Sequence, residues 1–372
     1  MDKDGQLIVS SNLINGFGYF IFTSLFIILF IKEGFNTFTY SIVYATSLII
    51  EAVILFFNPR IIAHLGLKYS AILFYIIPGV GIFLSTAFIE LPLIWFGYIL
   101  FIVGGAGWAP LATMIGKISK DGTFTKNLVS LISNSIRVGY IIGGVLTFTA
   151  VLSGYHMRII LMASSLIVII SGLPLIFLRR YESTETSPSI KMRSILASLG
   201  YGTMSQLTFI FVPLLPLYLY DRKIFIYFIP LFLLFRYLGA ILIGRAVSAK
   251  FDRNKKFILL IQFVLLISVL LLLLPYWYTI LIGLFLIGIG GMNHNFYFSI
   301  YARENKEISS SSAFSIGVLI SSAILIFAGG YIYNISILLV LMILVISLII
   351  SMVISYFLIQ KIQANGNNST PA

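Results

Sequence analysis

The stretch SLIIEAVILFF, residues 47–57, places one carboxylate, Glu51, inside an otherwise apolar run. The composition of the whole chain indicates which solvent surrounds this run. The 372 residues are 59% hydrophobic and only 10% charged, with a mean hydropathy of +1.06, whereas soluble domains carry roughly 25% charged residues. Apolar runs of about 20 residues, enough to span about 30 Å of hydrocarbon as a helix, recur along the chain. The sequence therefore predicts an all-α integral membrane protein, because a helix satisfies its own backbone polar groups in lipid.

Twelve apolar segments are long enough to be transmembrane spans. We expect them at 8–32, 38–57, 67–88, 92–116, 126–151, 157–178, 192–219, 223–247, 255–274, 277–301, 309–332 and 334–361. An even number of spans places both termini on one side of the membrane. Of the 24 Lys and Arg residues, eighteen fall in the tails and loops on that side and four in loops on the other. This bias predicts a multi-pass protein of the cell membrane with both termini cytoplasmic.

The two halves of the chain repeat their glycine pattern. When the sequence is shifted by 186 residues, half its length, six glycines fall on glycines, against about one expected by chance, and such internal repeats are typical of secondary transporters. Shared helix-packing chemistry without a repeat is the alternative explanation. Two of the matches are pairs of adjacent glycines: Gly104 and Gly105 align with Gly290 and Gly291, and Gly143 and Gly144 align with Gly329 and Gly330. These pairs favour two related halves that meet near the polar stretch at 179–193.

Six spans, a basic central segment and six more spans resemble the major facilitator superfamily over essentially the whole chain. In that family a glycine and basic residues mark the loop between spans 2 and 3. Here that loop reads NPRIIAHLGLKYS, residues 58–70, in which Gly66 and Lys68 fit the pattern and Ala63 replaces the acidic residue. The departure at Ala63 puts the family's usual charge relay between the halves in doubt.

Span 5 carries a second motif of the resemblance. The stretch SIRVGYIIGG, residues 135–144, matches the small-residue pattern of the family's antiporters at Gly139, Gly143 and Gly144, with Tyr140 in place of proline. Small residues let neighbouring helices approach closely, so we expect these glycines, with Gly329 and Gly330, to serve packing and gating. The arginine that proton-linked drug exporters carry in span 4 is absent here.

The resemblance implies a specific architecture and activity. It implies two pseudo-symmetric six-helix bundles, 1–178 and 194–372, joined by a cytoplasmic linker at 179–193. It also implies a monomeric secondary transporter that moves a small molecule by alternating access, with spans 1, 4, 7 and 10 lining the cavity and spans 5 and 8 facing each other.

Ionisable residues inside spans are costly, about 2.5 to 3.5 kcal/mol each on insertion scales, and are usually functional. Glu51 is the one carboxylate expected deep in a span, and it shares a helix face with Tyr44, Ser47 and Asn58. Two hypotheses stay open for it. It is either the site of proton coupling or a structural carboxylate that holds span 2 to serines of span 11.

Two arginines also fall inside spans, Arg137 in span 5 and Arg236 in span 8. In the resembled fold both would reach the cavity, where a net positive charge would favour an organic anion or an amphipathic substrate. Internal pairing of Arg236 with Glu51 is the alternative. Further substrate-binding candidates are polar or aromatic residues on the expected lining spans: Asn12, Tyr19, Trp108, Gln206, Asn293 and His294. Pro213 and Pro216 predict a break in span 7.

Several functions are not expected. The chain has no cysteine, so it has neither thiolate catalysis nor a cysteine metal site, and it carries no phosphate-binding loop for an ATP-driven pump. We therefore expect a non-enzymatic transporter with a small-molecule substrate, the lipid bilayer as its environment, the proton as candidate coupling ion, and no cofactor, metal or nucleic-acid partner. The alternatives are a uniporter, a multidrug exporter that depends on Trp108, and a non-transporting membrane sensor or scaffold.

Overall fold

The computed structural model describes residues 3–118, 122–180, 191–253, 256–304 and 310–367. Within this part of the chain all regular structure is helical, which confirms the predicted all-α class. The α-helices are α1 Lys3–Lys32, α2 Thr37–Ala87, α3 Leu91–Val103, α4 Trp108–Ile118, α5 Gly122–Leu152, α6 Met157–Ser171, α7 Leu173–Ile176, α8 Met192–Ser205, α9 Leu215–Asp221, α10 Ile229–Arg253, α11 Phe257–Leu273, α12 Trp277–Ile287, α13 Gly291–Glu304, α14 Ser310–Ile335 and α15 Ile337–Asn367. Short 3₁₀ segments are η1 Gly104–Gly107, η2 Leu207–Ile210, η3 Val212–Leu214, η4 Ile226–Phe228 and η5 Gly288–Gly290.

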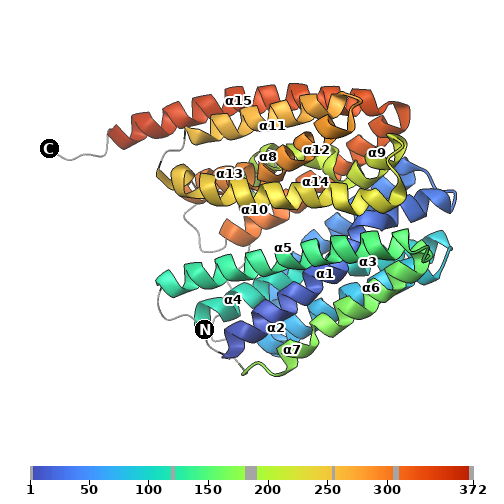
Figure 1. The fold of residues 1–372 in the computed structure, drawn as a ribbon. Coiled ribbons are helices and arrows are strands. Elements are labelled where there is room, and N and C mark those ends of the chain that lie inside the picture. The colour runs from blue at the N-terminus through green and yellow to red at the C-terminus, as the bar shows by residue number, and fades with distance from the viewer. Residues whose placement is uncertain (1–2, 119–121, 181–190, 254–255, 305–309, 368–372) are drawn as a thin grey trace.

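The helices form two groups that lie side by side (Figure 1). One holds α1 to α7, drawn in blue to green, and the other holds α8 to α15, drawn in yellow-green to red. The groups meet where α2 packs on α14 and where α5 packs on α10. The start of α1 and the end of α15 lie at the same end of the molecule (Figure 1). We call this end the termini side and the opposite end the far side. The predicted linker at 179–193 lies mostly outside the described residues.

Helix α2 spans two of the predicted segments. It starts at the N-cap Asn36, whose side chain accepts a hydrogen bond from the Thr39 backbone N–H at 2.7 Å. The loop predicted between 57 and 67 is largely helical, and the chain turns at Gly66. This glycine has φ +78° and ψ 161°, a conformation that side-chain-bearing residues rarely adopt. The expected loop is therefore reduced to a kink at one glycine.

Two other spans are interrupted at the aligned glycine pairs. The predicted continuous span 92–116 is α3, η1 and α4, and the predicted span 277–301 lies within α12, η5 and α13. Both 3₁₀ segments include glycines that the 186-residue shift aligns. A tighter 3₁₀ turn inside a helix marks a local change of axis or strain. Span 7 is also broken, but the 72° change of axis lies between Met192–Ser205 and Leu207–Asp221, at Gln206, and not at the predicted Pro213 and Pro216.

By length and composition, eight helices among the described residues could cross a membrane, or nine if the bent pair in span 7 counts as one. Ile226–Leu242 and Phe257–Leu273 are shorter apolar helices. Because α2 contains two predicted spans, the number of membrane crossings differs from the number of helices. The chain is a multi-pass membrane protein, and twelve crossings stay a prediction.

Candidate functional site

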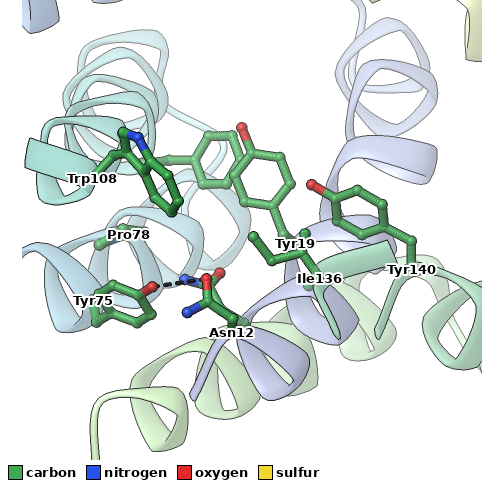
Figure 2. A pocket seen from close by; sticks show the side chains of 12 residues that line it. Asn12, Tyr19, Tyr75, Pro78, Trp108, Ile136 and Tyr140 are labelled. Carbon is green, nitrogen blue, oxygen red and sulfur yellow. Dashed lines mark hydrogen bonds between the residues drawn. The ribbon is translucent and has the colours of Figure 1, made fainter. Parts of the chain in front are cut away.

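A first cavity, of about 180 Å³, lies among the helices of the first group. We call it the termini-side cavity, because α1 enters it at Asn12 and runs from there toward the far side. Figure 2 shows the side chains around it, with Trp108 and Tyr75 on one side and Tyr19 and Tyr140 on the other. Trp108 is 45% exposed, so this cavity has an open wall. Its lining residues are Asn12, Asn15, Gly16, Tyr19, Tyr75, Pro78, Phe101, Gly104, Gly105, Trp108, Ile136 and Tyr140.

Some polar side chains of this cavity are already hydrogen-bonded to other parts of the protein, and others are not. Asn12 is engaged at both ends, since its Nδ2 donates to the Ile8 carbonyl at 2.8 Å and its Oδ1 accepts from the Tyr75 hydroxyl at 3.0 Å. Figure 2 shows this second bond as a dashed line. By contrast, no hydrogen bond joins Asn15 or Trp108 to another described residue. The unoccupied groups are the ones free to meet a ligand.

A second cavity, of about 170 Å³, lies between the two groups of helices, and we call it the far-side cavity. Arg236 of α10 is the one charged side chain among its described lining residues, which are Tyr19, Phe20, Thr23, Tyr40, Tyr44, Tyr98, Phe209, Val212, Pro213, Pro216, Leu233, Arg236 and Tyr237. The Tyr40 and Tyr98 hydroxyls are hydrogen-bonded to each other at 3.1 Å. The cavity is therefore an aromatic compartment with one cation.

No described carboxylate pairs with Arg236. Its guanidinium carbon lies 5.5 Å from the ring centroid of Tyr237, a cation–π contact. Among the described residues it makes neither an ion pair nor a hydrogen bond. Arg236 and Glu51 therefore do not form the ion pair that the alternative hypothesis requires in this conformation.

Tyr19 belongs to both cavities. Its ring centroid lies 4.7 Å from that of Phe101 and 6.5 Å from that of Tyr140. Tyr140 continues toward the second group of helices, with its ring centroid 4.5 Å from that of Tyr237. Tyr19 thus forms part of the wall that separates the termini-side cavity from the far-side cavity.

Glu51 is buried, with 8% of its surface exposed, and lies behind the termini-side cavity. A Cβ added to Gly105 would overlap its Oε1, so the carboxylate packs against η1. Asn58 lies about two helical turns further along α2, and its side-chain amide donates a hydrogen bond to the Ala106 carbonyl at 3.0 Å. Glu51 forms no hydrogen bond or ion pair with a described residue.

The structural alternative for Glu51 involved serines of span 11. Ser321 instead donates to the Leu199 carbonyl at 3.1 Å and accepts from the Thr203 hydroxyl at 3.1 Å. Its hydrogen bonds therefore tie α14 to α8, inside the second group of helices. Neither Ser321 nor the adjacent Ser322 forms a hydrogen bond with Glu51 among the described residues, so this conformation does not contain the structural alternative.

The substrate-binding residues predicted in spans 5, 7 and 10 are not among the described residues that line the two cavities. Arg137 is half-buried and is not among the described residues that line either of them. Gln206 Nε2 lies 3.0 Å from His294 Nδ1. Asn293 is buried, donates to the Met204 carbonyl at 2.7 Å, and accepts from Gln262 Nε2 at 2.9 Å. These contacts hold α8, α11 and α13 together.

The predicted packing glycines lie at close helix contacts. A Cβ on Gly139 or Gly143 would overlap the backbone of α1, and one on Gly329 would overlap the Ile210 carbonyl. Two of the set act across the groups, because a Cβ on Gly144 would meet Leu234 of α10 and one on Gly330 would meet the Ser41 side chain of α2.

Sequence reasoning did not select several lining residues. Tyr75, Tyr98 and Tyr237 come from three different helices, and Pro78 faces the cavity from the second half of α2. The chain contains 21 tyrosines, so residue type alone does not distinguish these. The one local signal was adjacency, since Tyr237 directly follows Arg236.

Two solved transporters have similar structures over nearly the whole chain. The nucleoside transporter NupG has 13% sequence identity and a TM-score of 0.69, covering 97% of this chain and 99% of its own. A bacterial homologue of the human lysosomal transporter Spinster, inward-facing and occupied, has 11% identity and a TM-score of 0.68, covering 96% of both chains. No protein-family model and no curated protein sequence matches the chain. At these identities the likeness establishes the fold.

Proposed function

We propose that this chain, which has the fold of the major facilitator superfamily, is a secondary transporter that moves a small organic anion across the membrane by alternating access. The two groups of helices, 1–178 and 194–372, rock about the cavities that lie within and between them, with 179–193 as the linker. The protein works as a monomer in the cell membrane, with both termini in the cytoplasm, and needs no cofactor.

The unpaired charge of Arg236 carries this proposal. Arg236 is partly buried, and an ionisable residue within a membrane-spanning segment is costly and usually functional. Arg236 lines a cavity between the two groups of helices and makes no ion pair among the described residues. An anionic substrate supplies the missing charge. A guanidinium also holds a carboxylate through two parallel hydrogen bonds.

The arrangement of contacts supports alternating access. On the far side the groups touch through aromatic pairs, with Phe38 and Phe327 at 5.4 Å and Phe148 and Phe228 at 5.9 Å between ring centroids. On the termini side the half-exposed Trp108 leaves a cavity wall open. This asymmetry fits a state closed on the far side and open on the termini side, with Tyr19 between the two cavities.

Proton coupling through Glu51 is the finer part of the proposal. The carboxylate is buried against η1, has no hydrogen-bonding partner among the described residues, and lies next to Gly105 of the cavity wall. A buried carboxylate beside a substrate cavity can exchange a proton when the cavity changes its access. Uniport with the same fold is the alternative, and it would leave transport independent of Glu51.

Two other functions stay as alternatives. A multidrug exporter would depend on Trp108 more than on Arg236 and would accept many hydrophobic compounds. A non-transporting sensor or scaffold would bind a partner protein without moving a solute. The unpartnered arginine favours the anion transporter over both.

Site-directed labelling tests the proposal without a known substrate, because the chain has no native cysteine. Ile136→Cys probes the termini-side cavity and Val212→Cys the far-side cavity. A membrane-impermeant maleimide is applied to vesicles of each orientation. We expect Ile136→Cys to react from the termini side and Val212→Cys from the far side, and any condition that increases one reaction to decrease the other. Reaction of both cysteines from both sides at once would indicate a pore and would contradict alternating access.

A further inference from the structure

The far-side cavity restricts the charge of what it can hold. Arg236 supplies one positive charge, and no other charged side chain is among the described residues that line it. A neutral ligand would leave this charge unpaired, and a dianion would bring a second charge into a low-dielectric site without a partner. The positive charge of Arg236 is therefore balanced by a ligand that carries a single negative charge.

The same cavity restricts the size of its ligand. Its volume is about 170 Å³, and an apolar cavity of about 150 Å³ is known to admit one benzene molecule. A single six-membered ring with one carboxylate therefore fills it. A two-part molecule such as a nucleoside exceeds it in this conformation.

The walls favour a flat, aromatic body. Seven of the thirteen lining residues are Phe or Tyr. Tyr44 meets Tyr98 and Phe209 edge-on, with ring centroids 5.4 and 6.3 Å apart. Aromatic rings pack on one another in such edge-to-face and offset arrangements with a gain beyond simple area burial. An inserted ring continues this pattern, whereas an aliphatic ring of the same size does not.

Unoccupied phenols accompany the guanidinium. The hydroxyls of Tyr19, Tyr44 and Tyr237 make no hydrogen bond with a described residue, and all three rings line the cavity. The Tyr237 ring beneath the guanidinium restricts its orientation. A carboxylate at this place could accept from the guanidinium through one edge and from a phenol through its remaining lone pairs.

We propose that the substrate of this transporter is a small aromatic monocarboxylate, bound with its carboxylate at Arg236 and its ring among the tyrosines of the far-side cavity. The inference rests on the proposed function and narrows it to one chemical class. It differs from the neutral nucleosides that the name of NupG indicates for that protein.

A matched ligand panel tests this inference on the purified, full-length protein. Benzoate is compared with benzamide, which has the ring without the charge, and with cyclohexanecarboxylate, which has the charge without aromaticity. Phthalate adds a second charge, and uridine represents the nucleosides. A ligand that binds the folded state raises the melting temperature, and at equal ligand concentration the rise is larger for the ligand that binds more tightly. We expect benzoate to raise it, cyclohexanecarboxylate to bind at least tenfold more weakly, and the other three to have no effect at the same concentration.

Variants locate the binding. Arg236→Gln should abolish the benzoate shift, and Arg236→Lys should weaken it by at least tenfold, because the ammonium lacks the planar fork. Lys32→Gln removes one charge from an exposed position outside the two cavities and should bind benzoate as the wild type does. If Arg236→Gln does not fold, Tyr44→Phe provides the second test, with benzoate affinity expected to fall several-fold.

Each contrary outcome has a distinct meaning. Equal binding of cyclohexanecarboxylate overturns the aromatic class and leaves an anion transporter. Binding of uridine without benzoate overturns the anion and leaves a transporter of neutral solutes. Binding of no panel member overturns the inference, and the cysteine labelling then decides separately whether the chain is a transporter.

Discussion

The carboxylate of Glu51 packs directly against the backbone of Gly105, in the 3₁₀ segment that interrupts the fourth span. The contact is possible because Gly105 has no side chain. It places the one carboxylate buried in α2 next to the wall of the termini-side cavity. A change in the shape of η1 would therefore move or expose this carboxylate.

Glu51→Gln should remove the pH dependence of transport and retain substrate binding. The amide has the same shape but does not take up or release a proton, so a coupling step that needs one is lost. The measurement is uptake into proteoliposomes at pH 5.5 and pH 7.5, with binding measured at both values. Unchanged pH dependence in Glu51→Gln would rule out Glu51 as the coupling site.

Gly105→Ala is the matched variant, because it keeps the carboxylate and displaces it. The added Cβ overlaps only the flexible end of the Glu51 side chain, so the protein should fold. We expect an altered pH profile without loss of the pH dependence. An unaltered profile would mean that the position of the carboxylate is unimportant.

Arg137→Gln should weaken benzoate binding much less than Arg236→Gln. Arg236 lines the far-side cavity and Arg137 is not among the described lining residues of either cavity. We expect at least a tenfold loss of affinity at Arg236, about 1.4 kcal/mol or more, and less than about threefold at Arg137. Titration of the two purified variants measures both values. Equal losses would indicate that both arginines reach the substrate, as the sequence alone suggested.

Gly330→Ala should loosen the closure of the far side. Its Cβ would overlap the side chain of Ser41, which forces α14 away from α2 where the two groups of helices meet. The expected result is faster maleimide labelling of Val212→Cys from the far side and slower uptake. Gly200→Ala is the matched control, since a Cβ there meets open space. Labelling that stays as slow as in the control would show that this contact does not close the cavity.

Asn293→Leu should lower stability and leave benzoate affinity intact. Both ends of the Asn293 amide are hydrogen-bonded within the second group of helices, and loss of buried hydrogen bonds costs about 1–3 kcal/mol. Asn295→Leu changes the same residue type at an exposed position two residues away and should cost less than about 0.5 kcal/mol. Thermal melts with and without ligand provide both values. Weaker ligand binding by Asn293→Leu at full stability would restore Asn293 as a substrate contact.

Much of the architecture follows from composition and hydrophobic run length. Lipid leaves a spanning chain few choices, so the all-α membrane class was predictable from the apolar runs alone. The sequence did not predict the 3₁₀ segments that interrupt spans 4 and 10, because its aligned glycines indicated a repeat and not a break in the helix. The kink of α2 depends on the backbone conformation of one residue, Gly66. The sequence predicted a loop between the two spans and did not predict that the helix would continue on both sides of this glycine.

The candidate site was less predictable because it depends on helix rotation. Arg137 and Arg236 each fall deep inside a predicted span, Arg137 near polar residues of its span and Arg236 among apolar ones. Which of them lines a cavity depends on the rotation of α5 and α10 about their axes, and the polar neighbours of Arg137 did not predict the outcome, because Arg236 is the one that lines a cavity. The tyrosines of the far-side cavity come from several helices, so no local sequence pattern predicts that they cluster.

Counterflow in proteoliposomes is the most direct test of the central claim, that Arg236 binds an organic anion which this protein carries across the membrane. Vesicles loaded with unlabelled benzoate are diluted into trace labelled benzoate, so that exchange concentrates the label inside. The account predicts transient accumulation with the wild-type protein and none with Arg236→Gln at equal incorporation. Accumulation that is equal in both proteins, or absent in both while uridine accumulates, would contradict it.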